Sequence, residues 1–191
     1  STNCAVGFVS ENTKATSCSS CSPGQETNTK SVAGGSSCND CDPGYFSDAR
    51  NYHICAACPK GWNQKQSKQL TCVICPIGYA STTEHTITDC DLCDSGEYSA
   101  LEGEEACSEC EIGFFTKPVS TAGQVRKDCK KCAYGQVTPT KKSSSCTKCN
   151  AGKYQNQSNT PSVVCNDCPT GRYLLDTATA AGEHDNVNDC L

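Results

Sequence analysis

The stretch Cys72-Val73-Ile74-Cys75-Pro76-Ile77-Gly78-Tyr79 contains the pattern that recurs along the whole chain. A Cys-x-x-Cys pair is followed by a glycine three residues after its second cysteine, and then by an aromatic residue. The Cys-x-x-Gly sequence begins at Cys4, Cys21, Cys41, Cys58, Cys75, Cys93, Cys110, Cys132, Cys149 and Cys168. Self-similarity at a short period is typical of repeat architectures. We therefore expect the function to lie in the array of repeats rather than in a catalytic pocket.

The composition indicates a scaffold held together by disulfides. The chain has 20 cysteines among 191 residues, whereas Leu, Ile, Val and Phe together supply only 25. So few large apolar residues cannot form one large core, and cysteines in an oxidising compartment must supply the missing stability. No apolar run resembles a signal peptide or a membrane span. The lack of Met, and the single halves of Cys-x-x-Cys pairs at Cys4 and Cys190, predict a window from a longer array.

Each repeat predicts a small β-hairpin. The residues before the glycine predict a tight turn, because glycine readily takes a positive φ. The aromatic residue is expected to begin a short strand and to pack on a disulfide. A polar tip such as residues 81–84 and a returning strand such as residues 86–88 complete the hairpin before the next cysteine. The expected fold is small, disulfide-rich and mostly β, an elongated rod of about ten stacked hairpin modules, EGF-like or cysteine-rich in style.

Parity favours one pairing of the cysteines. If the second cysteine of each pair bonds the first cysteine of the next, all twenty are used, whereas an interlocked scheme leaves two over. The bonds are then Cys4–Cys18, Cys21–Cys38, Cys41–Cys55, Cys58–Cys72, Cys75–Cys90, Cys93–Cys107, Cys110–Cys129, Cys132–Cys146, Cys149–Cys165 and Cys168–Cys190. The same bonds bound ten modules, approximately 4–18, 21–38, 41–55, 58–72, 75–90, 93–107, 110–129, 132–146, 149–165 and 168–190, in one tandem array over residues 1–191.

Zinc is the alternative use of these cysteines. Two Cys-x-x-Cys pairs at this spacing also match a Cys₄ zinc site. However, the turns after the cysteines read Pro-x-Gly-aromatic rather than as a zinc knuckle, and the three histidines are not at ligand spacing. A redox role would call for one exposed pair beside a βαβ pattern. Disulfides are therefore favoured.

The pattern Cys72-Val-Ile-Cys75-Pro76-Ile-Gly78-Tyr79 resembles the ephrin-receptor-like cysteine-rich repeat. It is similar in style to the cysteine-rich modules of tumour necrosis factor receptors and growth-factor receptors. It also resembles the tandem repeats of ciliate surface antigens and of EGF-like proteins in protist flagellar hairs. The resemblance covers essentially the whole chain and implies an extracellular disulfide rod, although true EGF modules carry a Cys-x-Cys step that is missing here.

The sequence carries little that suggests catalysis. No hydrolase, zinc-protease or phosphate-loop motif occurs, so we expect no enzyme, cofactor or metal. The His–carboxylate neighbours at His85 and His184 are interpreted as solvated surface. Asp89, Asp91 and Asp94 resemble part of a calcium loop, but no glutamate follows at the required spacing. One N-glycosylation sequon begins at Asn156, and the Ser/Thr-rich tips could carry O-glycans or be plain solvated loops.

The charges are banded along the chain. Residues 69–116 contain ten acidic residues and no Lys or Arg, whereas residues 117–153 contain nine basic residues and one acid, Asp128. Two interpretations stay open: association between rods with acidic band on basic band, or chance composition on solvated faces. The formal net charge of −5 and a secreted scaffold make nucleic-acid binding improbable.

Two functions are compatible with these features. The first is a segment of a surface filament, flagellar hair or coat that works by rigid stacking and self-association. The second is a receptor or adhesion ectodomain that binds a protein ligand through its hairpin tips. The candidate contacts for the second are Phe114-Phe115 and Tyr173-Leu174-Leu175, in the two longest modules. Both functions place the protein outside the cell, and neither requires a membrane span in this segment.

Overall fold

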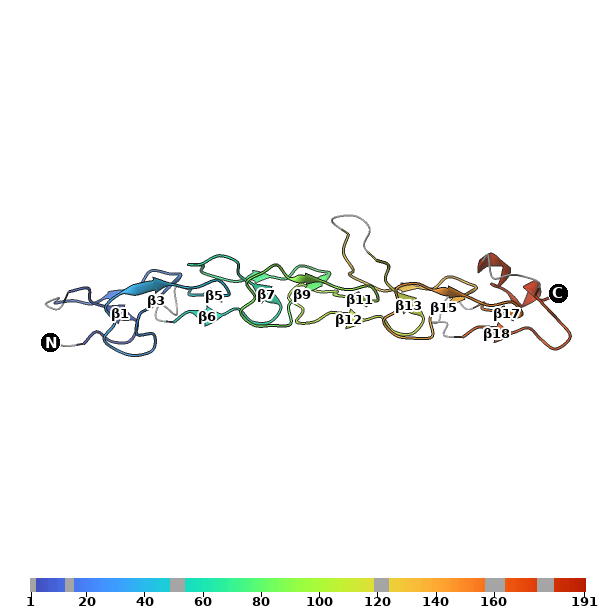
Figure 1. The fold of residues 1–191 in the computed structure, drawn as a ribbon, viewed down its shortest axis with the longest axis horizontal. Coiled ribbons are helices and arrows are strands. Elements are labelled where there is room, and N and C mark those ends of the chain that lie inside the picture. Colours follow the sequence, from blue (N-terminus) through green and yellow to red (C-terminus); the bar gives the residue numbers. More distant parts are fainter. Residues whose placement is uncertain (1–2, 13–15, 49–53, 119–123, 157–163, 175–180) are drawn as a thin grey trace. The chain divides into compact units, whose positions relative to one another are not determined.

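The computed structural model describes residues 3–12, 16–48, 54–118, 124–156, 164–174 and 181–191. Short strands pair with their neighbours in sequence to form two-stranded sheets (Figure 1). The pairs are β1 Phe8–Val9 with β2 Ser19–Ser20, β3 Gln25–Thr27 with β4 Cys38–Asp40, β5 Tyr45–Phe46 with β6 Ala56–Ala57, β7 Trp62–Asn63 with β8 Val73–Ile74, β9 Tyr79–Ala80 with β10 Asp91–Leu92, β11 Glu97–Tyr98 with β12 Ser108–Glu109, β13 Phe114–Phe115 with β14 Lys130–Lys131, β15 Gln136–Val137 with β16 Thr147–Lys148, and β17 Lys153–Tyr154 with β18 Asn166–Asp167. The expectation of disulfide-rich hairpin modules is confirmed. Two short 3-10 helices, η1 Ala181–Glu183 and η2 Val187–Asp189, follow.

The returning strands lie one segment later than expected. The strand that starts after the turn glycine is confirmed, but its partner lies inside the next Cys-x-x-Cys, as in Tyr45 opposite Ala57. Residues 86–88 form no strand. The reason is that, in described segments such as residues 85–88, the chain before the closing cysteine is bonded to the preceding module. The carbonyl of Thr86, for example, accepts a hydrogen bond of 2.9 Å from the N–H of Gln64.

Ten disulfides join the second cysteine of each pair to the first cysteine of the next, beginning with Cys4–Cys18 and ending with Cys168–Cys190. We number the closed loops as modules 1 to 10. All twenty cysteines are paired, and none is free. Partners are 14 to 22 residues apart in sequence. A loop of this size makes each crosslink worth about 3 kcal/mol in the chain-entropy model.

The chain divides into two compact units, which we describe separately. Unit 1 comprises Ser1–Pro76, Ala80–Asp91 and Glu102–Ala106, and unit 2 comprises Ile77–Tyr79, Leu92–Leu101 and Cys107–Leu191. The division passes through modules 5 and 6. It arises because loops of one module pack on earlier modules rather than on their own hairpin.

The core of both units consists of the opening cysteines rather than the aromatic residues. The opening cysteines of modules 1 to 9 are all buried, whereas most aromatic residues after the turn glycines are half-buried. One of them, Tyr45, stacks on the ring of His85, with ring centroids 5.0 Å apart. Buried sulfur thus replaces the missing large apolar side chains.

The turn glycines are required by their neighbours as well as by their backbone conformation. Gly44 has φ +84°, and a Cβ added there would lie 2.6 Å from the carbonyl oxygen of His85, two modules later. The same approach occurs at Gly24, where an added Cβ would lie 2.5 Å from the carbonyl oxygen of Lys68. Contacts of under 3 Å with backbone atoms leave no room for any side chain. Three consecutive modules therefore meet at each such glycine.

We predict that Gly44→Ala destabilises the protein more than Gly152→Ala. Both glycines have a left-handed backbone, with φ +84° and +75°, but no atom lies within 4 Å of a Cβ added at Gly152. Backbone strain should cost about 1 kcal/mol at both sites, and displacing the carbonyl of His85 should add about 1–3 kcal/mol at Gly44 alone. Denaturant unfolding measures the difference, and equal losses would contradict the close approach.

Candidate functional site

The junctions between modules are the site that the structure builds most completely. Their central element is the third residue after each turn glycine, which we call the ladder residue. The ladder residues of modules 2 to 10 are all buried: Thr27, Ser47, Gln64, Ser81, Ser99, Thr116, Thr138, Gln155 and Leu174. Eight of these nine are polar, so each needs hydrogen-bond partners inside the junction.

The backbone of the ladder residue bonds to both neighbouring modules at Ser47, Gln64, Ser81, Ser99 and Gln155. Its carbonyl accepts a hydrogen bond from the turn glycine of the module before, as in Gly24 N–H to Ser47 at 2.8 Å. Its N–H donates to the loop of the module after, as in Ser47 N–H to the carbonyl of Gln69 at 3.1 Å. The same two bonds recur in unit 2, where Gly78 donates to Ser99 at 3.0 Å and Ser99 donates to Arg126 at 3.0 Å.

Side chains complete the ladder at several junctions. The hydroxyl of Thr116 accepts a 2.6 Å hydrogen bond from the N–H of Gly96. At the next junction the N–H of Gly113 reaches both the hydroxyl of Thr138, at 2.8 Å, and its carbonyl, at 3.0 Å. Gln155 uses its amide oxygen in the same way toward Gly135, at 3.1 Å. Other ladder side chains bond within their own module, as in the hydroxyls of Thr27 and Ser99, which donate to the carbonyls of Lys30 and Leu101.

A second recurring element is a residue shortly before the closing cysteine, which we call the tip residue. The tip residues are Gly34, Lys68, His85, Gly103 and Lys142, and all five have positive φ. Each donates its N–H to the carbonyl of the opening cysteine of the preceding module, at 2.8–3.0 Å. The carbonyls of Lys68, His85, Gly103 and Lys142 then lie against the turn glycine of the module before that one. Non-glycine residues take this conformation at a cost that the junction must offset.

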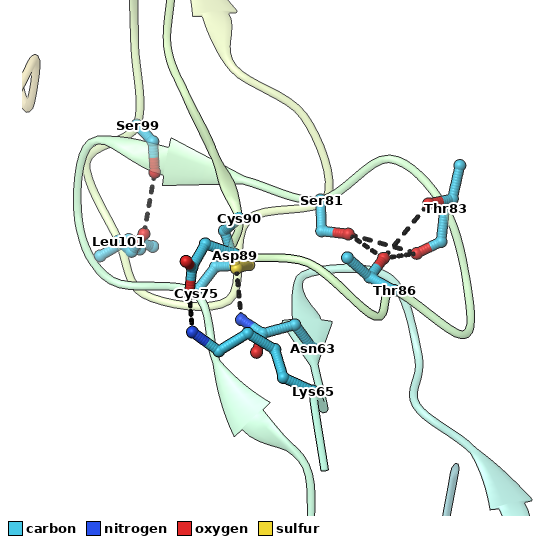
Figure 2. Close-up of a disulfide and its surroundings, with 10 residues drawn as sticks. All are labelled: Asn63, Lys65, Cys75, Ser81, Thr83, Thr86, Asp89, Cys90, Ser99 and Leu101. Atoms are coloured by element: carbon cyan, nitrogen blue, oxygen red, sulfur yellow. Dashed lines mark hydrogen bonds and ion pairs between the residues drawn. A yellow bond between two sulfur atoms is a disulfide. The ribbon is translucent and has the colours of Figure 1, made fainter. Parts of the chain in front are cut away.

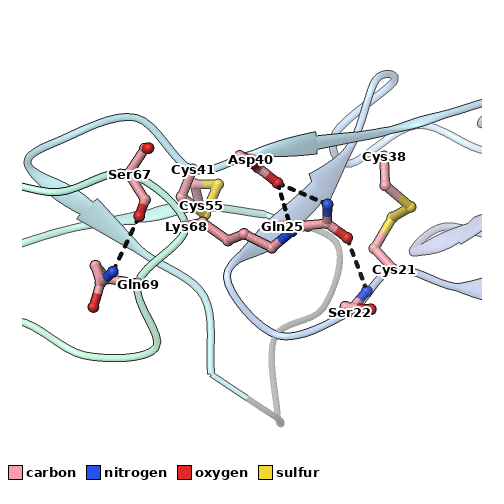
Figure 3. Close-up of polar contacts among 10 residues, drawn as sticks. All are labelled: Cys21, Ser22, Gln25, Cys38, Asp40, Cys41, Cys55, Ser67, Lys68 and Gln69. Carbon is pink, nitrogen blue, oxygen red and sulfur yellow. Dashed lines mark hydrogen bonds and ion pairs between the residues drawn. A yellow bond between two sulfur atoms is a disulfide. The ribbon is translucent and has the colours of Figure 1, made fainter.

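The tip side chains match the strand that they cover. Lys68 lies 3.4 Å from the carboxylate of Asp40, which also accepts a 2.7 Å hydrogen bond from the amide of Gln25 (Figure 3). The amide of Gln25, and then the charge of Lys68, lower the pKa of the Asp40 carboxyl below its ordinary value. The tip residue Gly103 has no side chain, and apolar side chains lie beside it instead of a charged partner. Atoms of Ile74 and Trp62 lie 3.2 Å and 3.9 Å from the position that a Cβ added at Gly103 would take.

One electrostatic junction joins the acidic band and the basic band within the chain. Glu97 and Glu109 are directly opposite on β11 and β12, an unfavourable pair of like charges. Lys142 reaches back to Glu97 at 2.6 Å, and Lys141 reaches Glu111 at 2.8 Å. Hydrogen bonding and charge attraction from Glu97, with further attraction from Glu109, raise the pKa of Lys142. Part of the predicted acidic-to-basic contact is therefore intramolecular.

The junction around the Cys75–Cys90 disulfide shows how a module is anchored to its predecessor (Figure 2). The buried amide of Asn63 donates to the sulfur of Cys90 at 3.0 Å, and Lys65 lies 2.7 Å from Asp89 (Figure 2). Because the Lys65–Asp89 pair is exposed, it contributes at most about 1 kcal/mol. The hydrogen bond from Asn63 to sulfur and the hydrogen bonds of the ladder residues are less exposed to water than this ion pair.

One of the two histidines interpreted as solvated surface differs from that interpretation. His85 is exposed, as expected, although its ring also stacks on Tyr45. His184 is buried, with Nδ1 2.7 Å from the carbonyl of Lys153, and its own carbonyl accepts a 2.7 Å hydrogen bond from Gln155. His184 thus occupies the loop position that contacts the ladder residue of the module before. The sequence did not indicate that His184 is buried, because its neighbours Glu183 and Asp185 are charged.

The remaining predicted residues lie apart from the junctions. Asn156 is exposed, while the serine of its sequon lies outside the described residues. Phe114 and Phe115 are half-buried, Tyr173 is exposed, Leu174 is a buried ladder residue, and Leu175 lies outside the described residues. Over the described residues, no cluster of three His, Cys, Asp or Glu side chains could hold a metal ion, and no helix is long and apolar enough to cross a membrane.

Two open hollows lie in unit 2. One of about 370 Å³ is lined by Lys117, Arg126 and Lys130, and one of about 350 Å³ is lined by Tyr98 and Phe114. The guanidinium of Arg126 is already bonded to the carbonyls of Lys117 and Cys93. Neither hollow is lined by a histidine or by a free cysteine.

Comparison with known proteins supports the EGF-like character of the repeats. No family model matches the chain. Over 71 residues the chain is 38% identical to the mouse protein "Signal peptide, CUB and EGF-like domain-containing protein 2" of Mus musculus. The match covers 34% of this chain and 7% of the mouse protein. The chain is therefore a disulfide-rich tandem-repeat protein of EGF-like character, and membership of the ephrin-receptor-like family stays a prediction.

We predict that Thr116→Val destabilises its junction more than Thr138→Val does. The change is nearly isosteric at both sites. It removes the acceptor of the Gly96 N–H in the first case, while Gly113 N–H keeps the carbonyl of Thr138 in the second. Leaving a buried N–H unsatisfied costs about 1–3 kcal/mol. Hydrogen exchange at the two glycine amides measures the effect, and equal exchange rates in the two variants would contradict this assignment.

The tip of module 4 should loosen in acid. Because the folded-state pKa of Asp40 is lowered, its stabilising contribution is present above the unfolded pKa and is lost as pH falls through the folded value. Protection of the Lys68 amide from exchange should therefore weaken below about pH 4. Asp40→Asn should remove this dependence, whereas Asp42→Asn should preserve it. An unchanged acid dependence in Asp40→Asn would refute the coupling.

Proposed function

We propose that this chain is a segment of an extracellular structural repeat protein, forming part of a surface filament, flagellar hair or coat. It works by rigid disulfide-linked stacking and by self-association, and it is not an enzyme. Twenty paired cysteines support an oxidising, extracellular location. The similarity to a protein named for a signal peptide, CUB and EGF-like domains supports the same location.

The observation that carries this proposal is the coupling of each module to the second module along the chain. In solenoids, stability usually follows from contacts between nearest neighbours alone. Here the tips of modules 4 and 5 also cover the turn glycines of modules 2 and 3, at Gly24 and Gly44. Flexing at one junction must then separate two sets of contacts. Such double coupling suits an element that resists bending more than one that closes around a substrate.

We further propose that the ten modules act as one array with N-glycans at Asn156. The exposure of Asn156, next to the half-buried strand β17, is compatible with a bulky glycan. The alternative, a receptor or adhesion ectodomain that binds through its hairpin tips, is less well supported. Lys68, His85 and Lys142 are tip residues already engaged by Asp40, Tyr45 and Glu97 respectively.

Electron microscopy of native surface material, labelled with an antibody to this chain, tests the proposal. Label at regular intervals along fibres is the expected result, because a structural subunit must recur along the polymer. Pre-adsorption of the antibody with the purified chain is the control. Label scattered over the membrane without any polymer would instead favour the ectodomain.

A further inference from the structure

Module 7 departs from the pattern of the tip residues. In modules 2, 4, 5, 6 and 8 a backbone N–H of the tip donates to the carbonyl of the opening cysteine of the preceding module. In module 7 the guanidinium of Arg126 donates to the corresponding carbonyl, that of Cys93. Because a long side chain makes this contact, the backbone of residues 124–128 has no positive φ. The cysteines of module 7 are also 19 residues apart in sequence, against 14 in modules 6 and 8.

Arg126 is held in place by its own module as well. Its Nε donates to the carbonyl of Lys117 at 3.0 Å, which joins the two sides of the long loop. Its backbone carbonyl accepts a hydrogen bond of 3.0 Å from the N–H of Ser99. The bonds to Lys117 and Cys93 use only Nε and Nη1, so further N–H groups of the guanidinium remain to donate to a ligand. A donor that is already fixed loses little freedom when it binds.

The long loop of module 7 borders an open hollow of about 370 Å³, a volume within the range of small-ligand pockets. Lys117, Arg126, Lys130 and Asp128 all line this hollow. Over the described residues, no carboxylate pairs with Lys117 or Lys130, whereas two other lysines of the basic band pair with glutamates. Among the residues that the structure describes, three cations and one carboxylate thus line the same hollow.

The mixed lining fits a sugar better than a simple anion. Pro118 and Val125 also line the hollow, and both are exposed, so they offer apolar surface to the C–H face of a ring. The carboxylate of Asp128 repels an inorganic anion, but it accepts hydrogen bonds from hydroxyl groups. The cations form charge-assisted hydrogen bonds with acidic substituents. A ligand that carries an acidic group, hydroxyl groups and an apolar face uses all of these side chains.

We propose that this hollow binds an acidic sugar unit, sulfated or uronic, of an extracellular polysaccharide. The acidic group lies against Arg126, Lys117 and Lys130. The hydroxyl groups donate to Asp128. The site rests on the extracellular location proposed above but not on self-association, and it gives a structural repeat protein an attachment to the polysaccharide around it.

NMR titration of the isotope-labelled 191-residue chain with a fully sulfated disaccharide tests this proposal. The expected dissociation constant is about 0.1–1 mM, as for a small ligand in an open site, with the largest shifts at residues 117, 126 and 130. A neutral disaccharide should cause no shift below about 10 mM. A uronic disaccharide without sulfate is the second acidic probe, and the tighter of the two identifies the acidic group.

The matched pair of variants is Lys130→Gln and Lys127→Gln. Both remove one positive charge from an exposed lysine of module 7, but only Lys130 lines this hollow. Lys130→Gln should weaken binding of the sulfated disaccharide about fivefold or more, whereas Lys127→Gln should leave it near the wild-type value. Equal weakening would overturn the site in favour of diffuse attraction to the basic band. Arg126 is not substituted, because it also holds two backbone carbonyls.

Asp128→Ala separates a sugar site from simple charge attraction by the sign of its effect. The change removes a negative charge from the hollow, so binding that depends on charge alone should become tighter. Loss of an acceptor for the hydroxyl groups should instead weaken binding about threefold or more. Tighter binding, or no shift with either acidic probe at about 10 mM, would overturn the proposal. Either result leaves the structural role open to its own test, the labelling of fibres in electron micrographs.

Discussion

The close approach of a carbonyl to a turn glycine is the constraint on which both units depend. At Gly44 the chain must have a left-handed backbone, an N–H that donates to the next module and no side chain. Its N–H bonds to the carbonyl of Gln64, in the next module, and its α-carbon faces His85, in the module after that. Only glycine meets these three conditions. The glycine of each Cys-x-x-Gly repeat therefore forms both a turn within its module and a contact with later modules.

Around this constraint the protein replaces an apolar core with sulfur and satisfied polar groups. The opening cysteines are buried, and beside them lie ladder residues such as Thr27 and Gln155, both with no exposed surface. A buried hydroxyl or amide is tolerated only where its hydrogen bonds are complete. Some of these bonds come from the same module, as in that from Thr27 to Lys30, and others from a neighbouring module, as in that from Gly135 to Gln155. An isolated module would expose these groups to water, so the array stabilises its own parts.

The charged residues modify this backbone framework rather than create it. Lys142 pairs with Glu97, which lies opposite Glu109 on the hairpin, and Lys68 pairs with Asp40. These pairs are substantially exposed, so their energies are small compared with those of the disulfides and ladder bonds. Their effect is selective, since the side chain of each tip suits the strand that it covers. Some residues of the acidic and basic bands therefore pair with each other between modules two places apart in the chain.

The sequence by itself determined the spacing of the disulfides, the first strand of each hairpin and the turn glycines, because these depend on covalent spacing and on local backbone preference. Cysteines such as Cys58 and Cys72 are near neighbours in the chain, and no other pairing uses them all so simply. Only the tertiary structure decided that Ser99 and Thr116 are buried, that His184 is not solvated, and that the returning strand lies inside the next Cys-x-x-Cys. Polar residues at these positions look like loop residues, because their partners belong to other modules. Contacts between modules two places apart leave no short-range periodicity in the sequence, so packing alone brings tip, ladder residue and glycine together.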